Sequence, residues 1–221
     1  MKRILRDNGL SIVVFGLFLL FLIGESIAGH RAGNEDRQQH GQPAQSYPEF
    51  IASGDFIEST TENWESEFLE MAAYALLTAF LFQRGSAESK KLDEPEAVDR
   101  DPRLSRHKGA APWPVRQGGW VLRVYENSLT LVFLLLFFGA FILHAWGGME
   151  AYNDQQRQHG ASPLSLIEFM STSHFWFQSL QNWQSEFLGL GSMVVLSIFL
   201  RQRGSPESKP VDAAHSETGS G

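Results

Sequence analysis

Long apolar runs alternate with polar stretches in a pattern that occurs twice along the chain. The first run, 10–23, and its counterpart, 129–143, are each interrupted only by one hydroxyl residue and one Gly. With their flanks they reach about 20 residues, enough for a helix to cross about 30 Å of hydrocarbon. Shorter apolar runs follow at 68–82 and 187–200. Because these are below the usual spanning length, their hydrophobicity alone does not distinguish spans from core helices.

The polar residues around these runs also repeat, which indicates an internal duplication. Residues 8–90 align without a gap with residues 127–209, at a constant offset of 119. Both short apolar runs end in the same basic Gln-Arg-Gly-Ser sequence, so we interpret both as membrane spans. The repeated motifs are Asn-Trp-Glu-Ser-Glu-Phe-Leu at 63–69, returning as Asn-Trp-Gln-Ser-Glu-Phe-Leu at 182–188, and Gln-Arg-Gly-Ser-Ala-Glu-Ser-Lys at 83–90, returning as Gln-Arg-Gly-Ser-Pro-Glu-Ser-Lys at 202–209.

The sequence therefore predicts an all-α fold, a four-span transmembrane helical bundle built from two tandem parallel two-helix repeats. A two-span repeat returns to its starting side, so the halves should be related by a pseudo-twofold axis along the membrane normal. The charged, proline-containing linker and the tail should be disordered. The predicted parts are membrane repeat 1 (1–90, spans 9–29 and 64–83), a cytoplasmic linker (91–117), membrane repeat 2 (118–209, spans 128–148 and 183–201) and a tail (210–221).

Lys and Arg are unevenly distributed between the predicted spans. Three precede the first span, and successive segments then carry two, nine, one and three. Positive residues stay on the cytoplasmic side, so both termini and the linker are predicted to be cytoplasmic. Residues 1–28 also resemble a signal peptide, with a basic start and a small-residue cleavage site. Because the matching segment 127–147 is internal, we expect the first helix to be retained.

Local signals predict where the helices of each repeat begin and end. The first helix should extend beyond the membrane as far as Gly41, a residue type favoured just after helix ends. Ser46 and Glu49 have the spacing of a capping box, which predicts a short helix. A further helix should begin near Phe56 and end near Gly85. The same signals recur 119 residues later.

The Asn-Trp motif contains the candidate functional residues. Trp64 and Glu67 are three residues apart, as are Trp183 and Glu186, so each pair shares a helix face. One interpretation is an aromatic belt with a hydrated carboxylate at the outer membrane surface. The other is a polar vestibule in which two carboxylates converge near the pseudo-twofold axis and bind a cation or relay protons. Glu25 and His144, at equivalent positions in the first spans, should then lie nearby.

Two further histidines, His40 and His159, lie near the predicted ends of the first helix in each repeat. Metal binding together with Glu49 and Glu168 is one interpretation. A protonated His is also favourable at a helix C-terminus, and this explanation fits isolated histidines better. We therefore predict no metal ligand and no cofactor in this chain.

Composition and motifs narrow the range of functions. The formal net charge is −7 and offers no basic character for nucleic acid binding. The chain has no Cys, which excludes disulfides and thiolate chemistry. No phosphate-binding loop, nucleophile elbow or zinc-helix motif occurs, so we predict no catalytic residue and no enzymatic activity. The preferred function is a structural or interaction module that packs with copies of itself or a membrane partner protein. The alternative is a small proton- or cation-linked transporter or channel with a site between the repeats.

The motifs also support a resemblance to a known family. The run Arg-Asp-Asn-Gly-Leu-Ser at 6–11, followed by the motifs at 63–69 and 82–90, resembles a bacterial membrane-protein family, domain of unknown function 6766. The resemblance covers nearly the whole chain apart from linker and tail. It implies bacterial origin and an inner-membrane location, and it assigns no activity to any residue.

Overall fold

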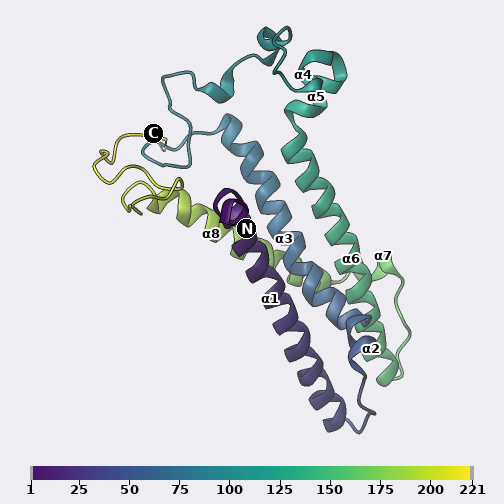
Figure 1. Ribbon diagram of the computed structural model, residues 1–221. Coiled ribbons are helices and arrows are strands. Elements are labelled where there is room, and N and C mark those ends of the chain that lie inside the picture. Colours follow the sequence, from purple (N-terminus) through teal and green to yellow (C-terminus); the bar gives the residue numbers. More distant parts are fainter. Residues whose placement is uncertain (1, 220–221) are drawn as a thin grey trace. The chain divides into compact units, whose positions relative to one another are not determined.

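The computed structural model describes residues 2–219, which form helices and turns without a β-strand (Figure 1). The all-α prediction is confirmed for these residues; residues 1 and 220–221, in the predicted first repeat and tail, lie outside them. The helices are α1 (Lys2–Gln39), α2 (Tyr47–Ile51), α3 (Gly54–Phe80), η1 (Ala97–Asp99), η2 (Pro102–Ser105), α4 (Trp113–Gln117), α5 (Gly119–Glu126), α6 (Ser128–Gln158), α7 (Leu166–Met170) and α8 (Ser173–Leu196). Two compact units share this chain: unit 1 is Met1–Thr61 with Leu143–Thr172, and unit 2 is Glu62–Ile142 with Ser173–Gly221.

Two of the described helices, α1 and α6, are long and apolar enough to cross a membrane. Buried core helices and N-terminal signal sequences can also satisfy this criterion. Only 22% of the apolar window of α6, and 6% of that of α1, is buried, whereas a core helix would be mostly buried. The helices α3 and α8 do not satisfy the criterion. Two candidate spans are therefore shown, and not the four that the sequence predicts.

Asparagine interrupts the helix at the same place in both repeats. In α1 the backbone leaves the helical region at Asn8 (φ −132°), whose side-chain amide donates to the Ile4 carbonyl at 3.2 Å. At the equivalent position, Asn127 ends α5 and donates to the Arg123 carbonyl at 2.8 Å. An Asn amide can satisfy a carbonyl at a helix end, so in repeat 2 the break separates the short helix α5 from the apolar helix α6.

A second asparagine in each repeat fixes the loop after the long helix. The Asn34 amide oxygen accepts the Gln45 N–H at 2.6 Å, and its Nδ2 donates to the Gln45 carbonyl at 2.9 Å. Asn153 makes the same two bonds with Leu164, at 2.7 and 2.8 Å. These loops begin at the glycines that the sequence predicts after the helix ends, and both glycines have a positive φ: Gly41 (69°) and Gly160 (71°).

The predicted capping boxes start both short helices. The N–H and hydroxyl of Ser46 donate to the Glu49 carboxylate at 2.8 and 2.6 Å. Those of Ser165 donate to Glu168 at 2.8 and 2.7 Å. The bonds from the serine side chain and backbone lower the pKa of both carboxyls. Their role here is to stabilise helix ends.

Glycine permits close packing inside unit 1. A Cβ on Gly147 would lie 2.7 Å from the Glu58 backbone nitrogen, so α3 and α6 are in backbone contact there. A Cβ on Gly148 would lie 2.9 Å from the ring of Phe169, which is fully buried. Its counterpart Gly29 has the same relationship to Phe50 on α2. Small residues allow helices this close approach.

The ends of α3 and α8 differ from the prediction, which placed them near Gly85 and Gly204. The helices end at Phe80 and Leu196. The reason is that the Gln-Arg-Gly-Ser motif forms its own turn. In repeat 1 the Gln83 N–H binds the Ser89 hydroxyl at 2.9 Å and therefore does not continue the helix. The motif in repeat 2 forms the equivalent bond between Gln202 and Ser208, also at 2.9 Å.

The residues after this second motif wrap around a buried lysine. Lys209 is 1% exposed, and its Nζ donates to the carbonyls of Ala214, His215 and Glu217 at 3.1, 3.1 and 2.8 Å. Farther along, the Gly219 N–H donates to the Ser86 carbonyl at 2.9 Å, within unit 2. The sequence predicts disorder here and in the linker, and this stays a prediction. The three bonds to the Lys209 amine are the contacts that hold the first part of the tail against this residue.

Candidate functional site

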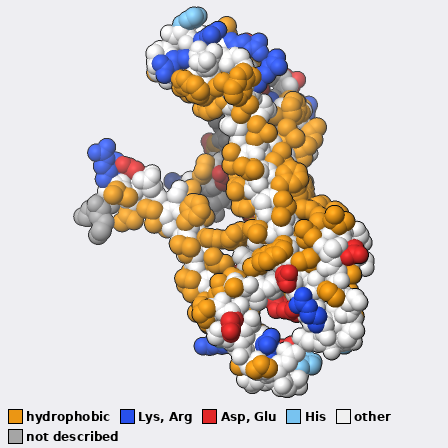
Figure 2. Space-filling view, turned by 90° about the vertical axis from the view of Figure 1, so that its right-hand side faces the viewer, with side chains coloured by type: hydrophobic (Ala, Val, Ile, Leu, Met, Phe, Trp, Pro, Cys, Tyr) orange, Lys and Arg blue, Asp and Glu red, His pale blue; other side chains and the backbone are white. Residues whose placement is uncertain are grey.

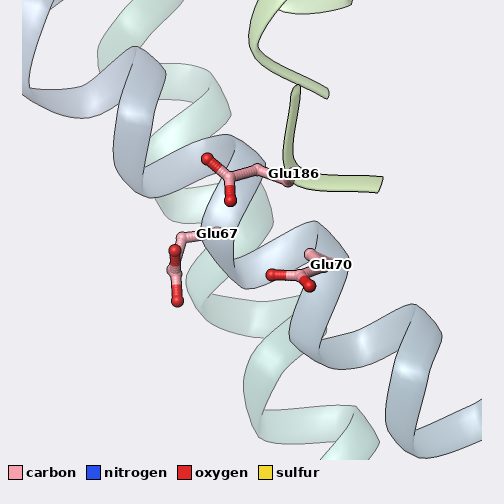
Figure 3. Close-up of side chains that lie close together, drawn as sticks. All are labelled: Glu67, Glu70 and Glu186. Carbon is pink, nitrogen blue, oxygen red and sulfur yellow. The ribbon is translucent and has the colours of Figure 1, made fainter. Parts of the chain in front are cut away.

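Unit 2 contains a cluster of three carboxylates on two helices. Glu67 and Glu70 lie on α3, and Glu186 lies on α8. One oxygen of each lies within 4.8 Å of the others. Figure 3 shows the three side chains gathered in one place. We call these three residues the carboxylate triad.

The members of the carboxylate triad differ in exposure. Glu67 is exposed, Glu186 is half-buried, and Glu70 is 8% exposed. Glu67 and Glu70 are one helical turn apart, which places them on the same face of α3. Hard cations prefer carboxylate oxygens as ligands, and the three carboxylates are close enough to share one cation.

Helical periodicity positions the triad. The Asn-Trp motif continues α3 and α8 without a break, since it contains no Gly or Pro. Beside Glu67, α3 packs against α6 through an aromatic pair: the ring centroids of Phe68 and Phe133 are 6.5 Å apart. The carboxylates are therefore presented from regular helices and not from a loop, which favours a fixed geometry.

The structure brings together Glu67 and Glu186, which are equivalent residues of the two repeats. The other predicted vestibule residues are placed differently. Trp64 is half-buried and belongs to unit 2. Glu25 is exposed and His144 is fully buried, and both belong to unit 1. Whether all six line one vestibule stays a prediction.

Trp183 has an internal partner. Its indole Nε1–H donates to Oε1 of Glu65 at 2.7 Å, and Glu65 is fully buried. Its ring packs edge-on against Phe137 and Trp176, with centroids 6.1 and 6.3 Å apart. The predicted belt role for this tryptophan would direct its N–H toward water, whereas here the N–H binds a buried carboxylate.

Sequence reasoning gave no role to two of these acidic residues. Glu70 is not among the residues that the repeated motif singles out, since its counterpart in repeat 2 is Gly189. Its spacing of three residues from Glu67, within an otherwise apolar run, is a signal that could have identified it. Glu65 has Gln184 as its counterpart and carries no such signal. Its burial depends on contacts far apart in the sequence.

The two loop histidines have local partners. Nδ1 of His40 lies 2.9 Å from the Asp36 carbonyl, and Nδ1 of His159 lies 2.8 Å from the Gln155 carbonyl. Both contacts span one turn at the end of a helix, as expected for a C-terminal His. Glu49 and Glu168, the proposed co-ligands in the metal interpretation, are engaged in capping boxes. The helix-end interpretation accounts for all four residues.

Comparison with known proteins gives a family and no activity. No curated protein and no solved structure matches the chain. One family model matches, over residues 1–220, and its description is domain of unknown function. A match over this extent establishes membership, so the chain belongs to the DUF6766 family.

Proposed function

We propose that this chain is an integral protein of the bacterial inner membrane, with four spans and both termini in the cytoplasm. The apolar surfaces of α1 and α6 support the first and third spans. For α3 and α8 the support is the repeat: each follows a long apolar helix at the same distance, and the same basic motif follows each of them in the sequence. The high Lys and Arg content of the linker supports the orientation.

Cysteine labelling tests the topology, since the chain has no native Cys. The equivalent exposed positions Gln39 and Gln158, at the ends of α1 and α6, would be replaced singly by Cys. Gln117, exposed at the end of α4, is the comparison position. An impermeant maleimide applied to intact spheroplasts should label the first two and not the third. Labelling of Gln117→Cys alone would reverse the orientation.

Within this membrane protein, the carboxylate triad is best suited to binding a cation or carrying protons, as in a small transporter or channel. The observation that carries this proposal is the convergence of the triad oxygens within 4.8 Å. Bringing carboxylates this close costs free energy unless protons or a cation neutralise part of the charge. Acidic side chains in apolar segments often mark ion or proton pathways.

Flux measurements in liposomes test this proposal. Purified protein would be reconstituted, and proton, Na⁺ and K⁺ fluxes followed under imposed gradients. Saturable flux that Glu70→Gln abolishes would support the proposal. Glu35→Gln, which changes an exposed carboxylate on α1, is the matched control and should retain flux. The proposal would be wrong if the protein carried none of these ions and if added cations left its stability unchanged.

A second candidate function is the structural or interaction module, without transport. One specific observation favours it: the buried carboxylate of Glu65 serves as an acceptor for Trp183. A carboxylate in this chain can therefore have a packing role. Under this proposal the protein would be recovered with copies of itself or with a membrane partner after mild crosslinking, and no triad substitution would change ion flux.

A further inference from the structure

The helices before α6 combine exposed arginines with exposed tryptophans. Trp113 is 61% exposed and Trp120 is 76% exposed, which is unusual for side chains of this size. At the top of Figure 2, Lys and Arg side chains lie beside hydrophobic ones over α4 and α5. We call the following residues the basic–aromatic patch: Arg103, Arg106, Arg116, Arg123, Trp113 and Trp120.

A cavity of about 610 Å³ lies within this patch. Its lining includes Arg103, Arg106, Arg123 and Trp120, together with the buried side chains of Val115 and Leu122. The volume lies in the range of small-molecule sites. The cavity thus has cationic groups at its rim and an apolar base.

Backbone contacts hold one of these arginines in place. Nε of Arg106 donates to the Arg116 carbonyl at 3.0 Å, and Nη2 donates to the Gln117 carbonyl at 3.3 Å. A Cβ on Gly118, whose φ is 71°, would lie 3.5 Å from Cζ of Arg106. The guanidinium therefore lies flat against the turn between α4 and α5. Because a guanidinium has further N–H donors, it can still bind an anion from this fixed position.

The charge balance of the cavity favours an anion. In the described part of the chain, no carboxylate forms an ion pair with Arg106 or Arg123. Arg103 has a distant contact of 3.8 Å with Asp101, and Glu126 is the acidic residue among the lining residues. The N–H groups of a guanidinium match the spacing of phosphate oxygens, so one arginine can donate two parallel hydrogen bonds to one phosphate.

The position of the patch in the chain indicates the source of the phosphate. The helix α5 ends at Glu126, and the apolar helix α6 begins two residues later, at Ser128. Trp120 and Val124 are one turn apart on α5, and both are exposed. Tryptophan is enriched where a bilayer meets water. An arginine-lined cavity at the start of a membrane span is therefore at the depth of lipid headgroups.

We propose that the basic–aromatic patch binds the phosphate headgroup of an anionic phospholipid in the cytoplasmic leaflet. Arg106 and Arg123 bind the phosphate, and Trp120 lies among the glycerol and upper acyl groups. The inference rests on the proposed membrane location, because α6 must span the bilayer for the patch to lie at its surface. It is independent of whether the carboxylate triad binds a cation.

The test uses the full-length protein, purified in detergent and titrated with phosphatidylglycerol. The readout is the lipid concentration that half-saturates retention, measured by native mass spectrometry. Phosphatidylcholine and inorganic phosphate are titrated separately. We expect retention of phosphatidylglycerol and not of phosphatidylcholine. Removing both charges with Arg106→Gln and Arg123→Gln should weaken retention about fivefold for each charge. The double Lys variant at the same positions should retain part of the affinity, because charge persists without paired geometry.

A charge-matched control removes two exposed arginines outside the cavity, Arg31→Gln with Arg84→Gln, and should bind as the parent does. Equal retention of phosphatidylglycerol and phosphatidylcholine by the parent would overturn the inference, even if the double variant failed to fold. So would displacement of the lipid by millimolar inorganic phosphate, which would indicate a site for a soluble anion. Loss of the parent from membranes after an alkaline carbonate wash would instead overturn the proposed membrane location. Retention in membranes without lipid preference would overturn the inference alone.

Discussion

The indole N–H of Trp183 donates to the fully buried carboxylate of Glu65 at 2.7 Å, and this bond joins the Asn-Trp motifs of the two repeats. The residues are not equivalent in the duplication, because the counterpart of Glu65 is Gln184, which is exposed. The two copies of the motif are therefore similar in sequence, but in unit 2 their equivalent residues differ in burial and in hydrogen bonding.

This bond predicts a graded response to substitution at position 65. Glu65→Ala removes the buried acceptor and leaves the half-buried indole N–H of Trp183 without this bond, which should reduce stability by about 1–3 kcal/mol. Glu65→Gln keeps an acceptor oxygen and should cost less. Thermal unfolding of the purified protein measures both. Gln184→Ala is the matched control at the equivalent exposed position, and an effect there as large as in Glu65→Ala would contradict the prediction.

The carboxylate triad predicts coupling between its members. Glu67→Gln and Glu186→Gln each relieve repulsion or remove a cation ligand, so their effects on stability should not add when combined. We expect an interaction free energy of about 0.5–3 kcal/mol from unfolding of the single and double variants. Pairing Glu67→Gln with Glu35→Gln should give additive effects. If the changes in unfolding free energy add in both pairs, and cations do not change the stability of the parent protein, the coupling is absent. Glu67 and Glu186 would then be two independent residues at the membrane interface.

The contact between α3 and α6 predicts that one glycine of α6 cannot be replaced. In Gly147→Ala the new methyl group would meet the Glu58 backbone nitrogen at 2.7 Å, and backbone atoms cannot move aside as a side chain can. We expect a loss of about 1–3 kcal/mol. Gly139→Ala on the same helix has no atom within 4 Å of the new methyl group and should be neutral or stabilising by about 0.5–1 kcal/mol. Equal stabilities of the two variants would refute the close contact.

The asparagine that holds the second loop predicts a local effect. Asn153 is 3% exposed and binds both polar groups of the Leu164 backbone. Asn153→Asp replaces the donor with an oxygen that faces the Leu164 carbonyl, so it should destabilise the loop by about 1–3 kcal/mol. Amide hydrogen exchange at Leu164 should become faster. Gln155→Ala, an exposed neighbour on α6, should leave that exchange rate unchanged.

The capping box of α7 predicts a pH dependence. The hydroxyl and N–H of Ser165 lower the pKa of Glu168 below its ordinary value of 4.5. A lowered folded-state pKa stabilises the folded protein above the ordinary value, and this contribution is lost as the pH falls through the folded pKa. Ser165→Ala should move the pKa of Glu168 back toward 4.5, which a carboxyl ¹³C NMR titration would detect. Glu49, in the equivalent box of α2, is the internal control and should titrate as before.

The sequence by itself determined the features that depend on neighbours along the chain. The capping boxes at Ser46 and Ser165 depend on bonds across three residues, and the glycine stops at Gly41 and Gly160 depend on backbone freedom at one residue. The duplication allowed each such signal to be read twice. The convergence of Glu67 with Glu186 was anticipated as the vestibule interpretation, because like positions of two repeats tend to meet at a common axis.

Only the tertiary structure decided which polar residues become buried and what they contact. Glu65 and Glu70 both lie on α3 with Glu67. Glu65 accepts the bond from Trp183, whereas Glu70 belongs to the carboxylate triad. Lys209 is charged and directly precedes the tail that the sequence predicts to be disordered, but three carbonyls of that tail surround its amine. The physical reason is that helix starts and stops are set by local hydrogen bonds, whereas burial depends on which distant segments pack together.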